Sequence, residues 1–464
     1  MSAVPSGGSF RDPSGFVFSR FGVLLRQVQE VYRADYDQLL GSGLYEELAE
    51  KGLLVKHGEE SLEAALTSGA YRVIKPEPVP FVSYPYEWCF SQLREGALLT
   101  LEIQQRALNR GMSLKDASAF NVQFIGSRPI FVDTLSFESY REGRPWVAYG
   151  QFCRHFLAPL LLTSRADVRL TRLLSVYLDG VPLDLASSLM PLSTWFRPMS
   201  LIHIHLQARA IRKFADAEVP RVAASRGVSR RGIQGILEHL KGGIEGLSWR
   251  GKTEWAGYGL DHAYDPVAFE QKQTLIRQMI EGVAPNVVWD LGSNTGVFSR
   301  LGEESGARVV AMDADPGAVE RHYQDVKGRR CSQVLPLWMD LSNPSAAVGW
   351  QHEERLSLQQ RGPADMVLVL ALIHHLAISN NVPLPLLSKW IAAMARFAVV
   401  EFVPKSDPQV GRLLRTREDI FQDYCQESFE AAFRERFEVL RCCPIPRSQR
   451  TLYLLRAVNG KADA

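Results

Sequence analysis

A short turn between an apolar run and a helical stretch constrains this chain more than any other feature. The segment Val287–Val297 reads VVWDLGSNTGV, in which an apolar strand ends at Asp290 and a turn with Gly292 and Gly296 opens a helix. Glycines let a ligand approach the backbone closely, and amides at a helix start can bind a carboxylate or another polar group. The spacing differs from the G-x-G-x-x-G of dinucleotide sites, because Asn294 occupies one glycine-like position. We therefore expect a nucleotide-type site without a pyrophosphate cradle.

The second half of the chain alternates apolar strand-like runs with helical stretches. This alternation indicates a parallel sheet covered by helices on both faces. Two late runs, 437–443 and 451–456, are separated by a turn too short for a parallel crossover, so this pair can be antiparallel. The sequence thus predicts an α/β fold with five parallel strands and a terminal antiparallel pair. The five runs are Val287–Leu291, Arg308–Asp313, Val334–Asp340, Met366–Leu372 and Phe397–Val403.

An aspartate stands at the end of each of the first three runs. These residues are Asp290, Asp313 and Asp340. Open parallel sheets bind ligands at the carboxyl ends of their strands, where an acid after the second strand can accept hydrogen bonds from ribose hydroxyls. Asp340 can face the amine edge of an adenine ring. A single such aspartate is often only a helix cap, but three at one sheet edge predict a shared binding site.

These motifs resemble those of class I S-adenosylmethionine-dependent methyltransferases. The resemblance covers roughly residues 255–457 and is carried by DLGSNTG, AMDAD, MDLSNP and ADMVLVLALIHHL. It implies a Rossmann-like seven-stranded sheet, S-adenosylmethionine as the cofactor and methyl transfer as the reaction. The binding residues that it implies are Asp290, Gly292, Ser293, Asn294 and Gly296 at the methionine end, Asp313 at the ribose, and Asp340 with Leu341 at the adenine.

The chemistry of a sulfonium leaves the protein mainly to align the reactants, and a base is needed only when the acceptor must lose a proton. His374 and His375 follow the fourth strand, where the family places residues that face the acceptor, and histidine titrates near neutral pH. The alternative is that these histidines only pack against neighbouring loops. Glu401, at the end of the fifth strand, is a second candidate base, and Lys405 could attract an anionic acceptor.

Residues 71–140 hold a second pattern. Asp116 and Asn121 are followed by Asp133 at the end of a predicted strand. This resembles the catalytic segment of protein kinases and aminoglycoside phosphotransferases, in which one Asp orients the acceptor hydroxyl while the Asn and a later Asp hold Mg²⁺. The stretch YPYEW would then be the hinge between two lobes. Asn121 and Asp133 are therefore metal ligands only if this half is active, and we predict no other metal site.

Several parts of the kinase pattern are altered in this chain. LKD stands in place of His-Arg-Asp, DTL replaces Asp-Phe-Gly, and the stretch Gly41–Leu48 reads as a helix rather than as a glycine loop. Lys56 and Lys75 match the phosphate-binding lysine only loosely. We therefore predict that the N-terminal half recognises the acceptor rather than turning over ATP.

The whole chain also resembles a family of long bacterial methyltransferases, some of which are described as nodulation proteins. Shared stretches outside the second half include SYPYEWCFSQL, GMSLKDASAFNVQF and PWVAYGQFCRHFLAPL. From the composition shift we expect a basic helical connector over 206–254. It separates an α+β domain over 1–205, which the resemblance above makes kinase-like, from the methyltransferase domain that the resemblance implies over 255–464.

Composition limits the partners and the compartment. Lys and Arg number 53 against 51 Asp and Glu, and this balance makes nucleic acid a less favoured partner. No apolar run approaches the ~20 residues of a membrane span, and six scattered cysteines without a disulfide or metal pattern are typical of a cytoplasmic protein. The acceptor stays open between a small molecule, a glycan and a protein. A bifunctional phosphotransferase and methyltransferase, or a cofactor-binding scaffold without turnover, also stays open.

Overall fold

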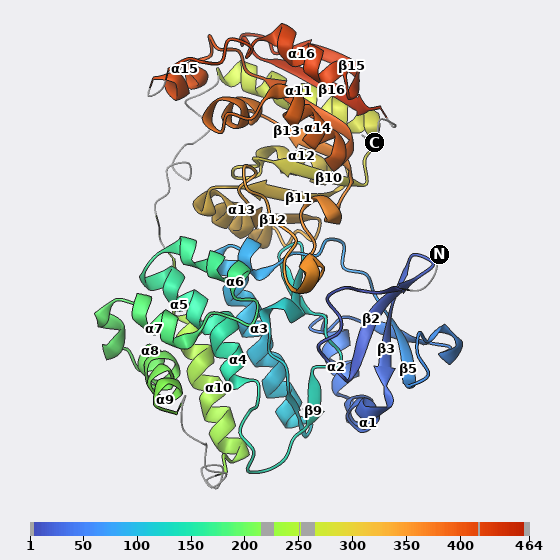
Figure 1. The fold of residues 1–464 in the computed structure, drawn as a ribbon, viewed down its shortest axis with the longest axis vertical. Coiled ribbons are helices and arrows are strands. Elements are labelled where there is room, and N and C mark those ends of the chain that lie inside the picture. Colours follow the sequence, from blue (N-terminus) through green and yellow to red (C-terminus); the bar gives the residue numbers. More distant parts are fainter. Residues whose placement is uncertain (1–3, 215–226, 250, 252–264, 416–417, 459–464) are drawn as a thin grey trace. The chain divides into compact units, whose positions relative to one another are not determined.

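The computed structural model describes residues 4–214, 227–249, 251, 265–415 and 418–458, and Figure 1 shows its ribbon. The chain forms two compact units. The first holds residues 1–251 together with 347–355, and the second holds 252–346 and 356–464. None of the helices in the described ranges has both the length and the apolar character that a membrane span requires.

The second unit is built on a seven-stranded sheet. Its strand order is β12-β11-β10-β13-β14-β16-β15. The first five strands run parallel, whereas β16 is antiparallel to both of its neighbours. This confirms the predicted five parallel strands and the late antiparallel pair. The strands are β10 (Val287–Leu291), β11 (Arg308–Asp313), β12 (Val334–Trp338), β13 (Ala364–Val369), β14 (Ala395–Phe402), β15 (Phe437–Pro444) and β16 (Thr451–Ala457).

Helices connect these strands, and their apolar faces pack on the sheet. Ile276 and Ile280 of one helix lie in the same buried cluster as Val288 and Val399 of the sheet. Aspartates fix where several helices begin; the Asp315 carboxylate, for example, accepts hydrogen bonds from the amides of Gly317 and Ala318. The helices are α11 (Pro266–Val283), α12 (Val297–Glu304), α13 (Pro316–Gly328), α14 (Leu384–Met394), α15 (Pro408–Leu414) and α16 (Gln426–Arg434), with a π-helical turn, η13, at His375–Ser379.

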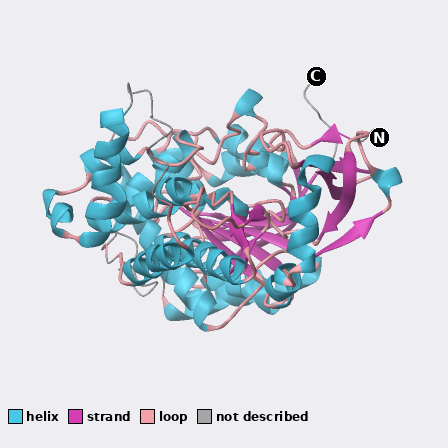
Figure 2. Ribbon diagram, turned by 90° about the horizontal axis from the view of Figure 1, so that it is seen from below, coloured by secondary structure: helices cyan, strands magenta, loops and turns pink. Residues whose placement is uncertain are grey.

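The first unit begins with a five-stranded antiparallel sheet, which lies beside the N label in Figure 2. Its order is β1-β2-β3-β5-β4, and two helices separate β3 from β4. The stretch Gly41–Leu48 lies at the end of the first helix and in the second one, so its helical interpretation is confirmed. The elements are β1 (Val4–Pro5), β2 (Gly15–Arg20), β3 (Val23–Gln29), α1 (Arg33–Gly41), α2 (Leu44–Glu50), β4 (His57–Glu60) and β5 (Ala70–Pro76).

The rest of the first unit is mainly helical. The long helix α3 (Phe90–Asn109) is followed by two antiparallel strand pairs, β6 (Met112–Leu114) with β9 (Phe137–Ser139) and β7 (Val122–Ile125) with β8 (Arg128–Phe131). The helices that follow are α4 (Tyr149–Phe152), η5 (Cys153–Leu157), α5 (Ala158–Arg165), α6 (Leu173–Val176), α7 (Leu183–Leu189), η7 (Leu192–Phe196), α8 (Pro198–Ser200), η8 (Leu201–His205), α9 (Leu206–Phe214) and α10 (Arg230–Glu245).

The range predicted as a connector, 206–254, holds a helix that packs within the first unit. Helix α10 lies against α3 and buries Ile233, Leu237 and Leu240. Residues 215–226, 250 and 252–254 of the predicted connector lie outside the described residues.

A short excursion of the chain, residues 347–355, joins the first unit although its sequence lies between β12 and β13. A bridge between Val348 and Arg355 closes it into a loop. The Arg11 guanidinium donates to both carboxylate oxygens of Glu354, at 2.7 and 3.1 Å. Gly7 approaches the excursion so closely that a Cβ there would lie 2.7 Å from the Cβ of Glu353. The excursion is therefore packed into the first unit rather than lying loosely on it.

Candidate functional site

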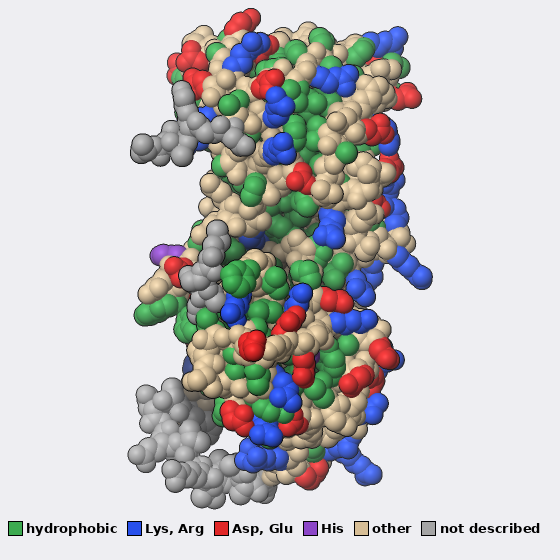
Figure 3. Space-filling model, turned by 90° about the vertical axis from the view of Figure 1, so that its right-hand side faces the viewer, with side chains coloured by type: hydrophobic (Ala, Val, Ile, Leu, Met, Phe, Trp, Pro, Cys, Tyr) green, Lys and Arg blue, Asp and Glu red, His purple; other side chains and the backbone are tan. Residues whose placement is uncertain are grey.

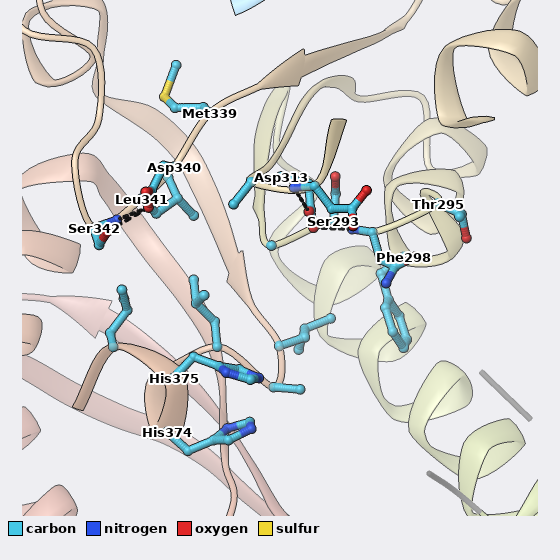
Figure 4. A pocket seen from close by; sticks show the side chains of 18 of the residues that line it. Ser293, Thr295, Phe298, Asp313, Met339, Asp340, Leu341, Ser342, His374 and His375 are labelled. Atoms are coloured by element: carbon cyan, nitrogen blue, oxygen red, sulfur yellow. Dashed lines mark hydrogen bonds between the residues drawn. The ribbon is translucent and has the colours of Figure 1, made fainter. Parts of the chain in front are cut away.

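A cavity of about 560 Å³ opens at the carboxyl ends of the parallel strands in the second unit. From β10 the chain adds β11 and β12 on one side of the sheet and then β13 and β14 on the other, so the strand order switches between β10 and β13. Open α/β sheets bind ligands at such switch points. Figure 4 shows side chains from several strand ends pointing into this space. Eight of the residues predicted for the site line the cavity: Gly292, Ser293, Asn294, Asp313, Asp340, Leu341, His374 and His375.

The turn after β10 has the backbone that its sequence predicts. Gly292 and Gly296 have φ values of 79° and 87°, which favour glycine, and Asn294 tolerates a φ of 49°. At Gly296 the lack of a side chain serves packing, because a Cβ built there would overlap the ring of His322. His322 lies buried on α13, where burial lowers its pKa to about 4 and keeps the ring neutral. No motif pointed to this histidine.

Asp290 lies behind the turn and does not line the cavity. Its side chain is buried, and Ser299 Oγ donates a 2.6 Å hydrogen bond to it. Burial raises the pKa of Asp290 to about 7, although the hydrogen bond from Ser299 opposes this shift. The carboxyl group thus holds the start of α12 against the end of β10.

Asp313 closes β11 and joins two parts of the site. Its Oδ2 accepts a hydrogen bond from the Asn294 amide, and its Oδ1 accepts one from the Asp315 amide, each at 2.8 Å. Burial raises the pKa of Asp313. Because each carboxylate oxygen has two acceptor positions, both oxygens can take a further hydrogen bond from a ligand in the cavity.

Asp340 lies two residues beyond β12 and lines the cavity on the side away from Ser293 (Figure 4). Its Oδ1 accepts hydrogen bonds from the amide and the hydroxyl of Ser342, at 2.9 and 2.7 Å. The side chain of the following residue, Leu341, is buried at the edge of the same cavity. An acceptor oxygen and an apolar surface thus stand next to each other, as a flat heteroaromatic ring requires.

The His374 and His375 rings lie 4.3 Å apart and point into the cavity (Figure 4). His374 is 2% exposed, and its Nδ1 has no hydrogen-bond partner among the described residues. Burial lowers the pKa of both rings, and for His374 the neighbouring His375, Arg450 and Lys272 lower it further. Both imidazoles are therefore neutral at pH 7 and able to accept a proton.

A buried network of two cations and two carboxylates stands beside the histidines. Lys272 Nζ bonds Glu401 Oε2 at 2.6 Å, while Arg450 reaches Glu401 at 3.4 Å and Asp407 at 2.7 Å. Lys272 and Arg450 line the cavity, whereas Glu401 does not. Glu401 therefore serves as the counter-charge of two cations. Sequence reasoning missed both cations, because a lysine in an amphipathic helix and an arginine after a turn belong to no motif.

Lys405, the other charged candidate of this half, is directed elsewhere. Its ammonium group bonds both carboxylate oxygens of Asp419 at 2.9 Å, and the residue does not line the cavity.

No family model matches this chain. It is 36% identical over 457 residues to the nodulation protein NoeA of Rhizobium meliloti (strain 1021), and the match covers 96% of this chain and 94% of that protein. The chain belongs to the NoeA family.

Two solved structures each resemble part of this NoeA-family chain. The N-methyltransferase NodS from Bradyrhizobium japonicum WM9, in complex with S-adenosyl-L-homocysteine, is 15% identical and has a TM-score of 0.33 over 44% of this chain and 94% of that one. WbdD, described as a bifunctional kinase-methyltransferase, is also 15% identical, with a TM-score of 0.29 over 44% of this chain and 42% of its own.

Asp116, Asn121 and Asp133, the three candidate residues of the kinase-like pattern, lie close together in this NoeA-family chain. The Asn121 side chain donates to Ser136 Oγ at 3.2 Å and also bonds Asp116. Burial raises the pKa of Asp116, and the nearby charge of Asp133 raises it further. The described residues hold no cluster of three or more His, Cys, Asp or Glu side chains suited to a metal ion.

Asp133 already has partners for its charge. It forms an ion pair with Arg26 of β3 and accepts hydrogen bonds from Ser136 Oγ and the Leu135 amide. Burial alone would raise the pKa of Asp133, but these partners keep it below its usual value. The position opposite Asp133 is thus occupied by the arginine of β3, Arg26. Lys75, which was one of the two lysine candidates, instead lies 4.0 Å from Glu60.

Proposed function

We propose that this NoeA-family chain is a class I S-adenosylmethionine-dependent methyltransferase. The observation that carries the proposal is the cavity at the carboxyl edge of the seven-stranded sheet, at the point where the strand order reverses. Ligands bind at this place in open α/β sheets. The N-terminal half would then recognise the acceptor.

The lining residues fit the parts of this cofactor. The oxygens of Asp313 would accept hydrogen bonds from the two ribose hydroxyls, and Asp340 with Leu341 would hold the amine edge and the face of the adenine. Gly292, Ser293 and Asn294 line the cavity, and the polar side chains of Ser293 and Asn294 would bind the methionine end. Gly296 would act through the backbone of the turn, since it does not line the cavity itself. Asp290 would act from behind the turn, by holding α12 against β10.

Methyl transfer then depends on alignment and, for a protic acceptor, on one proton acceptor. When bound, the cofactor supplies an electrophilic methyl group, so the protein need not activate it. A neutral His374 or His375 would take the proton that an acceptor hydroxyl or ammonium loses. Glu401 would act indirectly, by balancing the charges of Lys272 and Arg450 beside the rings.

Calorimetry with S-adenosylhomocysteine tests the cofactor assignment. Asp313→Ala removes the proposed ribose acceptor, and Gly292→Val forces a branched residue into a left-handed backbone position. Each variant should weaken binding at least tenfold, whereas Asp419→Ala, which alters an exposed acid away from the cavity, should not. Unchanged affinity in both site variants would refute the assignment.

Labelled S-adenosylmethionine added to cell extract identifies the acceptor. Fractions separated by size and by sensitivity to nuclease and protease distinguish a small molecule, a glycan, a protein and a nucleic acid. If the cofactor binds and no fraction becomes labelled under any condition, the chain is a cofactor-binding scaffold and the proposed turnover is wrong.

Phosphotransfer by the N-terminal half is a second candidate function. The convergence of Asp116, Asn121 and Asp133 favours it, whereas the ion pair between Asp133 and Arg26 opposes metal binding. We propose acceptor recognition for this half, without ATP turnover. Mg²⁺-dependent ATP consumption that disappears in Asp133→Ala would establish phosphotransfer instead.

A further inference from the structure

One segment of the first unit combines exposed apolar side chains with an excess of positive charge. From Leu185 to Lys213 the sequence contains Arg197, Arg209, Arg212 and Lys213 but no Asp or Glu. This segment forms η7, α8, η8 and α9 and the end of α7, and Figure 1 draws α7, α8 and α9 next to one another. The charge is local, since Lys and Arg exceed Asp and Glu by only two over the whole chain. Acidic and basic side chains are interspersed over the face drawn in Figure 3, which is another face of the molecule.

The apolar part of this surface is unusually exposed. Phe196 and Leu192, both in η7, are 89% and 81% exposed, the highest values for large hydrophobic residues among those the structure describes. Buried apolar side chains are the rule, and contiguous exposed ones mark sites of interaction. The energy of leaving two such side chains in water therefore needs an explanation.

Two ring contacts place η7 alongside the following helical segment. The Trp195 ring stacks on His205 at 4.2 Å with an angle of 10° between the planes, and the Arg209 guanidinium lies 4.5 Å from the Trp195 ring. On that segment Ile202 and Leu206, one turn apart, are each 46% exposed. We call Leu192, Phe196, Ile202 and Leu206, together with Arg165, Arg197 and Arg209, the apolar-basic surface.

The positive charges of this surface lack carboxylate partners. Arg165, Arg197 and Arg209 form no ion pair with any residue that the structure describes. Arg165 is partly buried, its Nε has no hydrogen-bond partner in the described chain, and Arg197 lies close enough to disfavour its charge. Guanidinium groups bind phosphate and carboxylate groups through paired hydrogen bonds. An anionic partner would thus supply what the protein itself does not.

We propose that the apolar-basic surface docks this protein on an anionic lipid bilayer. Phe196 and Leu192 enter the boundary between head groups and acyl chains, while the arginines bind lipid phosphates, as in proteins that lie on a membrane without crossing it. This proposal is independent of methyl transfer, because all of its residues lie in the first unit and outside the cavity.

A second copy of the chain is the other occupant to consider. In a two-fold symmetric contact each surface meets itself. The unpaired arginines of one copy would then face those of the other, and the segment from Leu185 to Lys213 holds no Asp or Glu to separate them. Like charges brought together in this way weaken association, and the bilayer is therefore the favoured partner.

Vesicle flotation of the full-length protein tests the proposal. The protein should float with vesicles of phosphatidylglycerol and phosphatidylcholine, much less with phosphatidylcholine alone, and less again as salt concentration rises. Arg197→Gln should weaken binding about fivefold, which is the effect of one basic residue near such a surface. The double variant Leu192→Ser with Phe196→Ser should weaken it about tenfold or more.

Val31→Ser is the matched control. Val31 is 76% exposed but lies beside an arginine, Arg33, that is ion-paired with Glu30, and its loss should leave flotation unchanged. All the changed side chains are exposed, so the melting temperature should stay within about 2 °C of the parent value and exclude unfolding as a cause.

Three results would overturn the proposal. The first is a parent protein that does not float with the anionic vesicles. The second is equal flotation of the parent and the double variant. The third is a parent protein that sediments as a dimer, becomes monomeric in the double variant and ignores the vesicles, which would assign the surface to a second copy of the chain.

Discussion

Replacing Glu401 by glutamine should destabilise the second unit, because the change leaves two buried cations beside a neutral side chain. Lys272 and Glu401 are 2% and 0% exposed, and their charged atoms are 2.6 Å apart. Arg450 keeps Asp407 as a partner, so the uncompensated charge falls mainly on Lys272. Breaking a buried pair by removing one partner costs about 3–5 kcal/mol. We expect a loss near the lower value, since the glutamine oxygen can still accept a hydrogen bond.

A second substitution separates charge compensation from catalysis. Lys272→Met removes the ammonium and fills its space, so the double variant Lys272→Met with Glu401→Gln should be more stable than the sum of the single losses predicts, by at least about 1 kcal/mol. Burial lowers the pKa of Lys272, and Glu401 opposes this shift. Without Glu401 the lysine should therefore lose its proton at a lower pH.

The assay is urea-dependent hydrogen exchange of the amides of β13 and β14. Strand β14 carries Glu401 and β13 is its parallel neighbour, so their exchange reports the second unit alone. A single global transition is not expected of a chain with two compact units. A Glu401→Gln variant with unchanged stability and lost turnover would refute the reasoning and identify Glu401 as a catalytic base.

Three further predictions concern the same unit. Gly296→Ala should lower stability by about 2–4 kcal/mol and weaken cofactor binding, because its Cβ would overlap His322 in a left-handed backbone position; unchanged thermal melting would contradict this. His374→Asn should lower turnover about 10²–10⁴-fold with nearly unchanged cofactor affinity. Because the pKa of His374 is lowered, the turnover of the parent enzyme should fall on the acidic side only below pH 6.5. A fall in turnover centred at pH 6.5 or above would exclude His374 as the general base. The pKa of Asp290 is raised to about 7, so the stability gained from its protonated form is present at low pH and lost as pH rises through 7. The free energy of unfolding of Asp290→Asn, relative to the parent, should therefore be higher at pH 8 than at pH 5 by about 1 kcal/mol or more. Equal differences at both pH values, measured by the same exchange of β13 and β14, would argue against the shift.

The parts of the site that follow strands could be predicted from the sequence. An apolar run ending in an acid has one position in a parallel sheet, so the sequence alone places Asp313 and Asp340 at the carboxyl edge. The same reasoning applies to His374 and His375, which follow the end of β13 after four intervening residues. Local pattern was sufficient because neighbouring strands bring their ends to one edge.

Side chains that reach the site from elsewhere could not be predicted in this way. Lys272 meets Glu401 across 129 positions of sequence, and Arg26 meets Asp133 across more than a hundred. In the sequence, His322 is one polar residue of an amphipathic helix. Only the structure shows that Gly296 packs against its ring. Each of these residues acquires its role from a tertiary partner, and neither hydrophobic period nor spacing carries that information.

The excursion at 347–355 bears on how this chain was assembled and how it can be divided. Nine residues encoded within the second half complete the first, where Glu354 meets Arg11 and Glu353 covers Gly7. No single cut in the gene can release both compact units whole. A recombination event that exchanged the second half for a relative's would also exchange part of the first unit's interior, so such a chimaera needs an excursion that fits Arg11 and Gly7.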